Sequence, residues 1–132
     1  TGNKANIREK NVIGNNVSIG TLSVIEHQVQ IEDNVRIHSQ SFIPEFSVLK
    51  KGSWVGPNVV FTNAKYPLHP DSKKNLKGPM LLEDCKIGAN STLLPGVVIG
   101  KSAMVGAGSV VTKDVLDFDT VIGNPAVSIK KN

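Results

Sequence analysis

The chain contains very little cysteine, few aromatic residues and no long apolar segment. Cys85 is the only cysteine among 132 residues, so no disulfide can form within the chain, and we expect a cytoplasmic protein. Phe, Trp and Tyr together make up 5% of the residues, which favours a narrow core of Ile, Val and Leu over one built on rings. No apolar run approaches the ~20 residues needed to span a bilayer, so we expect no membrane partner.

The net charge of +4 is modest. The lysines are scattered along the chain and are not interleaved with aromatic residues, which argues against a nucleic-acid partner. A small polyanionic ligand is compatible with this charge.

A six-residue repeat runs through most of the sequence. Between residues 87 and 111 an aliphatic residue returns at every sixth position, namely at Ile87, Leu93, Ile99, Val105 and Val111. A helix would need a period of 3.6 and a simple strand a period of 2, whereas a period of six is typical of a parallel β-helix. The same register extends back to Ile7, and small or β-branched residues follow four places after most aliphatic ones. We therefore predict an all-β, single-stranded parallel β-helix, with three repeats in each triangular coil and coils ~4.8 Å apart.

The repeat breaks once, after Asn63, and resumes at Leu81. The inserted segment is polar and rich in proline, so we expect a loop that leaves one corner of the solenoid. After Val115 the hexads stop, and the remaining residues should cover the open end of the core. Within one domain, the chain divides into N-terminal coils (1–63), an insertion loop (64–80), C-terminal coils (81–116) and an irregular C-terminal cap (117–132).

Residues that are 18 apart should stack, and one such column consists almost entirely of glycine. Its members are Gly2, Gly20, His38, Gly56 and, after the insertion, Gly88 and Gly106. Glycine permits tight corners as well as close approach of a ligand to the backbone. We expect corner geometry at the N-terminal end of this column and a ligand groove at Gly88 and Gly106.

A second column lies at the corner from which the loop springs. It contains Glu9, His27, Glu45 and Asn63. A histidine that stacks between two carboxylates, at steps of ~4.8 Å, has the surroundings of a general base. The alternative is that these are ordinary solvated turn residues.

Three further groups of residues bear on function. Arg36 and His38 face outward beside Trp54, which suggests an anchor for a neighbouring subunit or, alternatively, a surface on which a ligand stacks. Cys85 occupies an inward position and is expected to be a core residue, not a nucleophile. His69 lies in the insertion, which we expect to act as a lid.

The most regular segments resemble the hexapeptide-repeat acyltransferases, and the resemblance covers essentially the whole chain. They are I-G-A-N-S-T-L-L-P-G-V-V-I-G, A-M-V-G-A-G-S-V-V-T-K-D-V and V-I-G-N-P-A-V-S-I-K-K. The resemblance implies a left-handed helix, a homotrimer and acetyl-CoA bound between neighbouring subunits, with no metal. It places pantetheine along Gly88, Ala89, Gly106 and Ala107, and the nucleotide end of the cofactor near Lys113, Asn124, Pro125, Lys130 and Lys131.

The segment V-G-P-N-V-V-F-T-N-A-K-Y-P narrows the resemblance. Sugar O-acetyltransferases of this fold carry a catalytic histidine before the proline of the loop, where this chain has Tyr66 followed by Pro67. The segment is instead similar to N-acetyltransferases that act on nucleotide-linked amino sugars, including 3-amino-3,6-dideoxyhexoses. This similarity implies direct attack of an amine on the thioester in a ternary complex, with Asn63 orienting the reacting groups.

The same resemblance leaves the proton acceptor open. His27 with Glu45 is one candidate, and His38 or His69 acting across a subunit interface is another. Tyr66, His69, Trp54 and Arg36 are the residues expected to bind the acceptor.

Two other classes of protein share this fold. A zinc carbonic anhydrase would need a closely spaced histidine pair, whereas His27, His38 and His69 are separated by 11 and 31 residues. A non-catalytic trimeric scaffold would explain the hexads but not the insertion or the glycine column. A sugar O-acetyltransferase is the nearest alternative among the acyltransferases.

Overall fold

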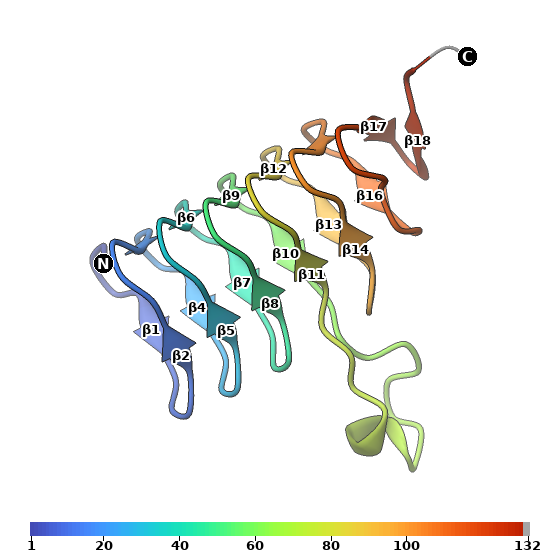
Figure 1. Ribbon diagram of the computed structural model, residues 1–132. Helices are drawn as coiled ribbons and strands as arrows, with labels where there is room; N and C mark the ends of the chain where they lie inside the picture. Colours follow the sequence, from blue (N-terminus) through green and yellow to red (C-terminus); the bar gives the residue numbers. More distant parts are fainter. Residues whose placement is uncertain (131–132) are drawn as a thin grey trace.

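The computed structural model describes residues 1–130, which wind into a left-handed parallel β-helix with three flat faces (Figure 1). This confirms the fold expected from the hexads. Such a winding departs from the usual right-handed rule for crossovers between parallel strands. Within the described residues, no helix is long and apolar enough to cross a membrane.

Each face is a sheet of two-residue strands that pair in parallel with the coils before and after them. Sheet A contains β1 (Asn6–Ile7), β4 (Val24–Ile25), β7 (Phe42–Ile43), β10 (Val60–Phe61), β13 (Thr92–Leu93) and β16 (Val110–Val111). Sheet B contains β2 (Val12–Ile13), β5 (Gln30–Ile31), β8 (Val48–Leu49), β11 (Met80–Leu81) and β14 (Val98–Ile99). Sheet C contains β3 (Ser18–Ile19), β6 (Arg36–Ile37), β9 (Trp54–Val55), β12 (Lys86–Ile87), β15 (Met104–Val105), β17 (Thr120–Gly123) and β18 (Ala126–Ser128).

The corners between the sheets follow the same six-residue period. The AB corner includes residues 8–10, 26–28, 44–46, 62–63, 94–96 and 112–114. The BC corner includes residues 14–16, 32–34, 50–52, 82–84, 100–102 and 116–118. The CA corner includes residues 2–4, 20–22, 38–40, 56–58, 88–90 and 106–108. In nearly every corner the third residue has a positive φ, and most of these residues are not glycine.

The core is a single column of aliphatic side chains at the positions predicted from the repeat. The second residue of each strand from β3 to β17 is buried, whereas Ile7 and Ile13 in the first coil are 37% and 38% exposed. The first coil has a neighbour on one side only, which explains this difference. Buried serines satisfy corner carbonyls from the inside, since Ser23 and Ser41 donate to the carbonyl oxygens of residues 38 and 56.

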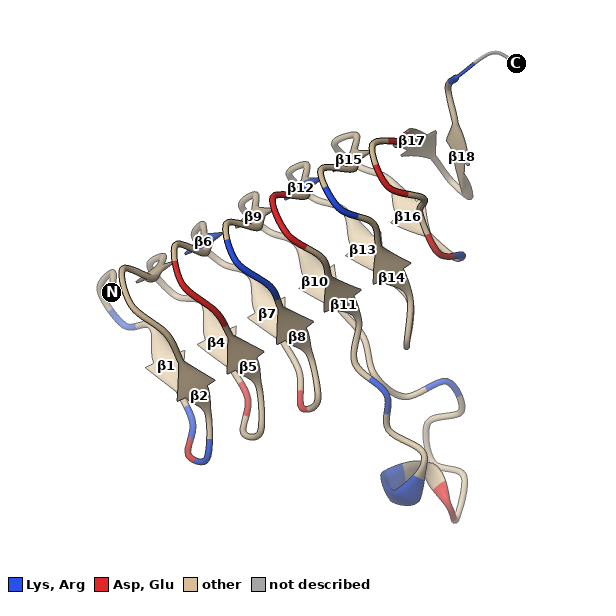
Figure 2. Ribbon diagram, in the orientation of Figure 1, with Lys and Arg blue, Asp and Glu red and all other residues tan. Residues whose placement is uncertain are grey.

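Charges alternate along the BC corner (Figure 2). Acidic pairs at residues 32–33 and 83–84 flank the lysine pair at residues 50–51, and Lys101 and Asp117 continue the alternation. Lys50 Nζ lies 3.3 Å from Glu32 Oε2. From the second coil onward, the BC corner of each coil therefore faces opposite charge on its neighbours, which stabilises this stacking order over one in which a coil is skipped.

The insertion leaves the AB corner after Asn63 and extends away from the prism (Figure 1). The backbone N–H of Lys77 donates to the carbonyl of Asn63 at 2.9 Å and closes the stem of the loop. The loop contains the short 3-10 helix η1 (Ser72–Lys74), and its Leu68 is 99% exposed. The loop ends at Pro79, one residue earlier than expected, because Met80 already belongs to β11.

The end of the chain differs in detail from the irregular cap expected over residues 117–132. Val115 bridges to Ile99, and Val121 in β17 pairs in parallel with Val105, so one more coil stacks on the prism. Hydrogen-bonded partners in this coil are 16 residues apart instead of 18, which is why the hexad register is lost in the sequence. Strand β18 then folds back antiparallel to β17.

Ser53 gives a first testable prediction. Its hydroxyl is fully buried and has no hydrogen-bond partner within the described residues, whereas the Ser41 hydroxyl donates to Gly56 at 3.0 Å. We expect Ser53→Ala to leave the free energy of unfolding unchanged or to raise it, and Ser41→Ala to lower it by about 1–3 kcal/mol. Urea unfolding of both variants would measure this, and an equal loss in both would contradict the hydrogen-bond assignment.

Leu22 gives a second prediction. It is an exposed corner residue with φ of 62°, a left-handed conformation that costs a branched side chain about 1–2 kcal/mol and that asparagine tolerates better. Leu22→Asn should therefore raise the melting temperature. Leu22→Ala, which keeps the strain and only removes exposed atoms, is the control, and an equal rise in both variants would rule out this explanation.

Candidate functional site

The AB corner brings His27, Glu45 and Asn63 into contact. His27 Nε2 lies 3.7 Å from Glu45 Oε1, and Asn63 Nδ2 donates to Glu45 Oε2 at 2.8 Å. Asn63 Nδ2 also lies 3.2 Å from the Glu45 carbonyl oxygen, so it holds both the backbone and the side chain of Glu45. The three residues come from successive coils, as the 18-residue spacing predicts, and we name them the AB cluster.

This geometry is able to orient an imidazole. One carboxylate oxygen of Glu45 is held by Asn63, and the other faces the His27 ring, whose Nδ1 lies 3.1 Å from Gln28 Oε1. All three side chains are partly exposed, so the ring is accessible to a ligand. A histidine backed by a fixed carboxylate is the arrangement that proton-transfer catalysis uses.

Glu9 completes the column on the other side of His27. The pKa of the Glu9 carboxyl is lowered, chiefly because its own backbone N–H donates to it, and also by the neighbouring Arg8 guanidinium and His27 ring. His27 is therefore flanked by carboxylates along the stack. Among residues 1–130, no group of three or more His, Cys, Asp or Glu side chains could hold a metal ion.

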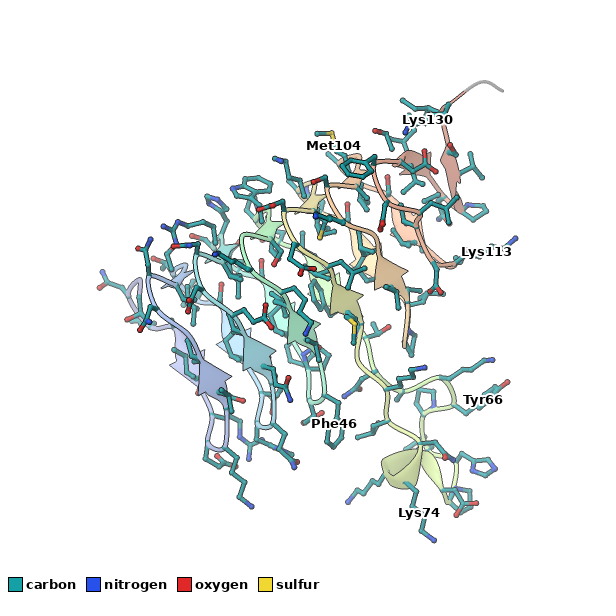
Figure 3. The ribbon with its side chains drawn as sticks, viewed as in Figure 1. Phe46, Tyr66, Lys74, Met104, Lys113 and Lys130 are labelled. Atoms are coloured by element: carbon teal, nitrogen blue, oxygen red, sulfur yellow. The ribbon has the colours of Figure 1, made fainter. Side chains whose placement is uncertain are left out.

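The loop residues Tyr66 and His69 lie apart from this cluster. Together with Lys65, Ser72 and Asn75 they line a small cavity within the loop itself, and Tyr66 projects from it (Figure 3). The backbone N–H of Asp71 donates to His69 Nδ1 at 3.1 Å, so the lone pair of that nitrogen is occupied. In residues 1–130, no hydrogen bond or ion pair joins either loop residue to the AB cluster.

The residues expected to anchor a ligand or subunit lie on sheet C and at the CA corner. The ring centroids of His38 and Trp54 are 4.7 Å apart, with the ring planes at 55°. Arg36 is the register partner of Trp54 in the preceding coil, and its guanidinium donates to the carbonyls of Asn16 and Val35. Among the described residues no ion pair joins His38 to a carboxylate, whereas His27 lies 3.7 Å from Glu45.

Close stacking of the coils explains the glycine column at both of its ends. A Cβ atom at Gly20 would lie 2.4 Å from the backbone nitrogen of Ser39, and one at Gly88 would lie 2.5 Å from that of Ala107. The close approach of the next coil is therefore enough to explain why residue 88 is glycine. The glycine by itself is not evidence that pantetheine binds at this corner.

At this corner, the backbone N–H groups that remain free for a ligand belong to the residues that follow the glycines. The N–H groups of Gly88 and Gly106 already donate to the next coil, at 2.8 Å in each case, and the Gly106 carbonyl accepts from Ser91. Within the described chain, the N–H groups of Ala89 and Ala107 donate to no other group. The Gly88 carbonyl is also unpaired within the described residues, because Val59 lies where Ser23, Ser41 and Ser91 donate to the equivalent carbonyls, but this carbonyl faces the core and not a ligand.

The C-terminal residues expected near the cofactor nucleotide surround the open end of the prism. Lys113 and Pro125 line a cavity of about 310 Å³ whose apolar walls include Val111 and Val127. Asn124 lies in the turn between β17 and β18, and Lys130 Nζ donates to the Phe118 carbonyl at 2.6 Å (Figure 3). Lys131 lies outside the described residues.

Cys85 is a core residue, as expected. It is fully buried, and desolvation raises the pKa of its thiol to about 12. A thiolate nucleophile is therefore excluded at neutral pH, which removes a covalent acyl-cysteine intermediate from consideration.

In one chain the functional residues fall into two groups at opposite edges of sheet A. The AB cluster lies at one edge, and the CA corner with Ala89, Ala107 and the His38–Trp54 pair lies at the other. We predicted one functional site from the sequence, but in a single chain sheet A separates the AB cluster from the CA corner residues. It also gave no sign of Lys86 as a neighbour of Trp54, because the insertion hides their stacking.

The fold and the hexads define the class of protein. Residues 12–45 and 78–113, more than half of the chain, match the family described as bacterial transferase hexapeptide (six repeats). The chain belongs to that family.

Curated relatives are similar over parts of the chain. Galactoside O-acetyltransferase of Lactococcus lactis is 40% identical over 80 residues, which cover 58% of this chain and 39% of that protein. The dTDP-3-amino-3,6-dideoxy-alpha-D-galactopyranose 3-N-acetyltransferase of Aneurinibacillus thermoaerophilus is 60% identical over 40 residues, which cover 30% of this chain and 21% of that protein. The chain thus spans well under two thirds of the length of these relatives.

Solved structures show the same fold. PerB from Caulobacter crescentus, in complex with CoA and GDP-perosamine, superposes with a TM-score of 0.80 at 22% identity. The match covers 96% of this chain and 54% of that one.

Proposed function

We propose that the protein is a cytoplasmic acetyltransferase that moves the acetyl group of acetyl-CoA to the amine of a nucleotide-linked amino sugar. The observation that carries this proposal is the AB cluster, in which a histidine is oriented by a carboxylate that Asn63 holds. The amino-sugar N-acetyltransferase that shares 60% identity over 40 residues supports the choice of acceptor.

The surroundings of His27 favour an amine over a hydroxyl. The Glu45 carboxylate lies 3.7 Å from the ring and forms no ion pair with Lys or Arg within residues 1–130, so a cationic amine is attracted to this side of His27. The ammonium form cannot attack, so His27 would first accept a proton from it. The neutral amine then forms the C–N bond at the thioester carbonyl. As the C–S bond breaks, the nitrogen gives up a second proton and becomes an amide, and the CoA thiolate takes up that proton and leaves as the thiol.

The CA corner would hold the cofactor. The free N–H groups of Ala89 and Ala107 are spaced along the stack and suit the carbonyl oxygens of the pantetheine amides. One such N–H is also a donor for the oxyanion that develops on the thioester. The adenine nucleotide would occupy the C-terminal cavity, with Lys113 and Lys130 near its phosphates.

A homotrimer would unite the two half-sites. The outward side chains of sheet A between the two corners are mainly apolar, and they include Val24, Phe42, Val60 and Val110. Phe42 and Val60 are 37% and 39% exposed, which is unusual for apolar residues in one row on a monomer. Packing of this face against a second copy would bring the AB corner of one subunit beside the CA corner of the next.

The alternative within the family is transfer to a sugar hydroxyl, which the similarity to galactoside O-acetyltransferase supports. Assays with four acceptors would distinguish transfer to an amine from transfer to a hydroxyl. The acceptors are dTDP-3-amino-3,6-dideoxygalactose, GDP-perosamine, a galactoside and maltose. Release of CoA can be followed with a thiol reagent, because the buried Cys85 does not react. Turnover with an amine confirms the proposal, and turnover with hydroxyl acceptors alone contradicts it.

Binding should be measured before turnover. A ligand at 100 times its Kd stabilises the native state by ~2.7 kcal/mol, so CoA should raise the melting temperature. No shift with millimolar CoA would favour a non-catalytic scaffold.

A further inference from the structure

Trp54 lies between two cations on the outward face of sheet C. In the register of the sheet, Arg36 of β6 is its partner on one side and Lys86 of β12 its partner on the other. The His38 ring contacts the indole from the CA corner. The Arg36 guanidinium is held by two backbone carbonyls through Nη1, which fixes its position, and its other nitrogens donate to no group among residues 1–130.

The sign of the charge changes across the molecule. From β3 to β15, the outward positions of sheet C are Ser18, Arg36, Trp54, Lys86 and Met104, and the CA corner contains no Asp or Glu. The chain has 11 acidic residues, and those of its N-terminal half lie at the AB and BC corners (Figure 2). An anion is therefore favoured on this face, whereas the Glu45 carboxylate at the AB corner favours a cationic amine.

We propose that Trp54, His38, Arg36 and Lys86 bind the nucleoside diphosphate of the acceptor, which deepens the proposed function and depends on it. The base stacks on the Trp54–His38 pair, and the two phosphates accept hydrogen bonds from Arg36 and Lys86. A subunit that contributes this face beside the AB corner of its neighbour binds both ends of one acceptor, the phosphates on one subunit and the amine on the other.

CoA also contains a nucleoside diphosphate, so two sources share this chemistry. The position along the axis favours the acceptor. Lys113 lies three coils beyond Glu45 in the AB column, and coils are ~4.8 Å apart, which places the proposed cofactor nucleotide at the C-terminal end. Trp54 lies near the level of Glu45, where the acceptor amine is expected.

The test measures binding of free dTDP, UDP and GDP by titration calorimetry in the presence of saturating CoA. Lys86→Gln removes an exposed cation whose amine makes no hydrogen bond or ion pair within residues 1–130, and Trp54→Leu removes the stacking surface. Lys101→Gln, on the BC corner, is the control with the same change of charge. We expect at least one nucleoside diphosphate to bind the wild type, and each of the first two variants to weaken its binding about 10-fold.

The outcomes separate this site from the proposed function. Weakened nucleotide binding with unchanged CoA affinity confirms the site. Weakened CoA binding, equal weakening in Lys101→Gln, or no binding to the wild type overturns it. If Trp54→Leu changes the oligomeric state and Lys86→Gln leaves nucleotide affinity unchanged, Trp54 is a subunit anchor instead. Acetylation of an amino sugar by the wild type is measured separately, so the proposed function survives or fails on its own result.

Discussion

His27→Ala should lower kcat for acetyl transfer by about 100- to 10,000-fold, the usual contribution of a positioned acid–base group. The reason is the contact with Glu45, 3.7 Å away, which presents the ring to a ligand in one orientation. The affinity for acetyl-CoA should change little, because the proposed cofactor groups lie at the opposite edge of sheet A. Steady-state kinetics together with a binding titration would separate the two effects.

Glu45→Gln tests the orienting role of the carboxylate. It keeps the volume and one hydrogen-bond acceptor but removes the charge that faces His27, so we expect a smaller loss of kcat and a shifted pH profile. Glu32→Gln makes the same chemical change at the BC corner and is the control.

Recovery of the activity of His27→Ala by added imidazole would support proton transfer, whereas an unchanged kcat/KM in His27→Ala would remove His27 from the mechanism.

The repeat predicted the interior of the protein almost completely. Every buried aliphatic residue from Ile19 to Val111 occupies a position that the period of six assigns inward. The prediction succeeds because every coil must direct its apolar side chains toward the same axis. An inward apolar residue is therefore required at the same position of each hexad. The prediction extends to Val115, which is 5% exposed, and fails beyond it, because the last coil is shorter and its partners are 16 residues apart.

The site was only partly predictable. The spacing of 18 brought His27, Glu45 and Asn63 together correctly, because no insertion separates them. Trp54 and Lys86 are neighbours across the insertion, so that spacing does not reveal them. The free backbone groups of the CA corner could not be identified either, since they depend on the direction in which each coil donates its hydrogen bonds to the next.

Ile31→Ala should lower the free energy of unfolding by about 2–5 kcal/mol, the cost of an unfilled cavity in a rigid core. Ile31 is 2% exposed and pairs in register with Ile13, which is 38% exposed in the first coil. Ile13→Ala removes the same atoms from the same sheet, and we expect it to cost clearly less, because the end coil is open on one side. Urea unfolding followed by circular dichroism at several protein concentrations would measure both losses and show whether either variant also weakens subunit association. A loss near zero for Ile31→Ala would contradict its inward position, and equal losses would contradict a solenoid whose first coil is only half packed.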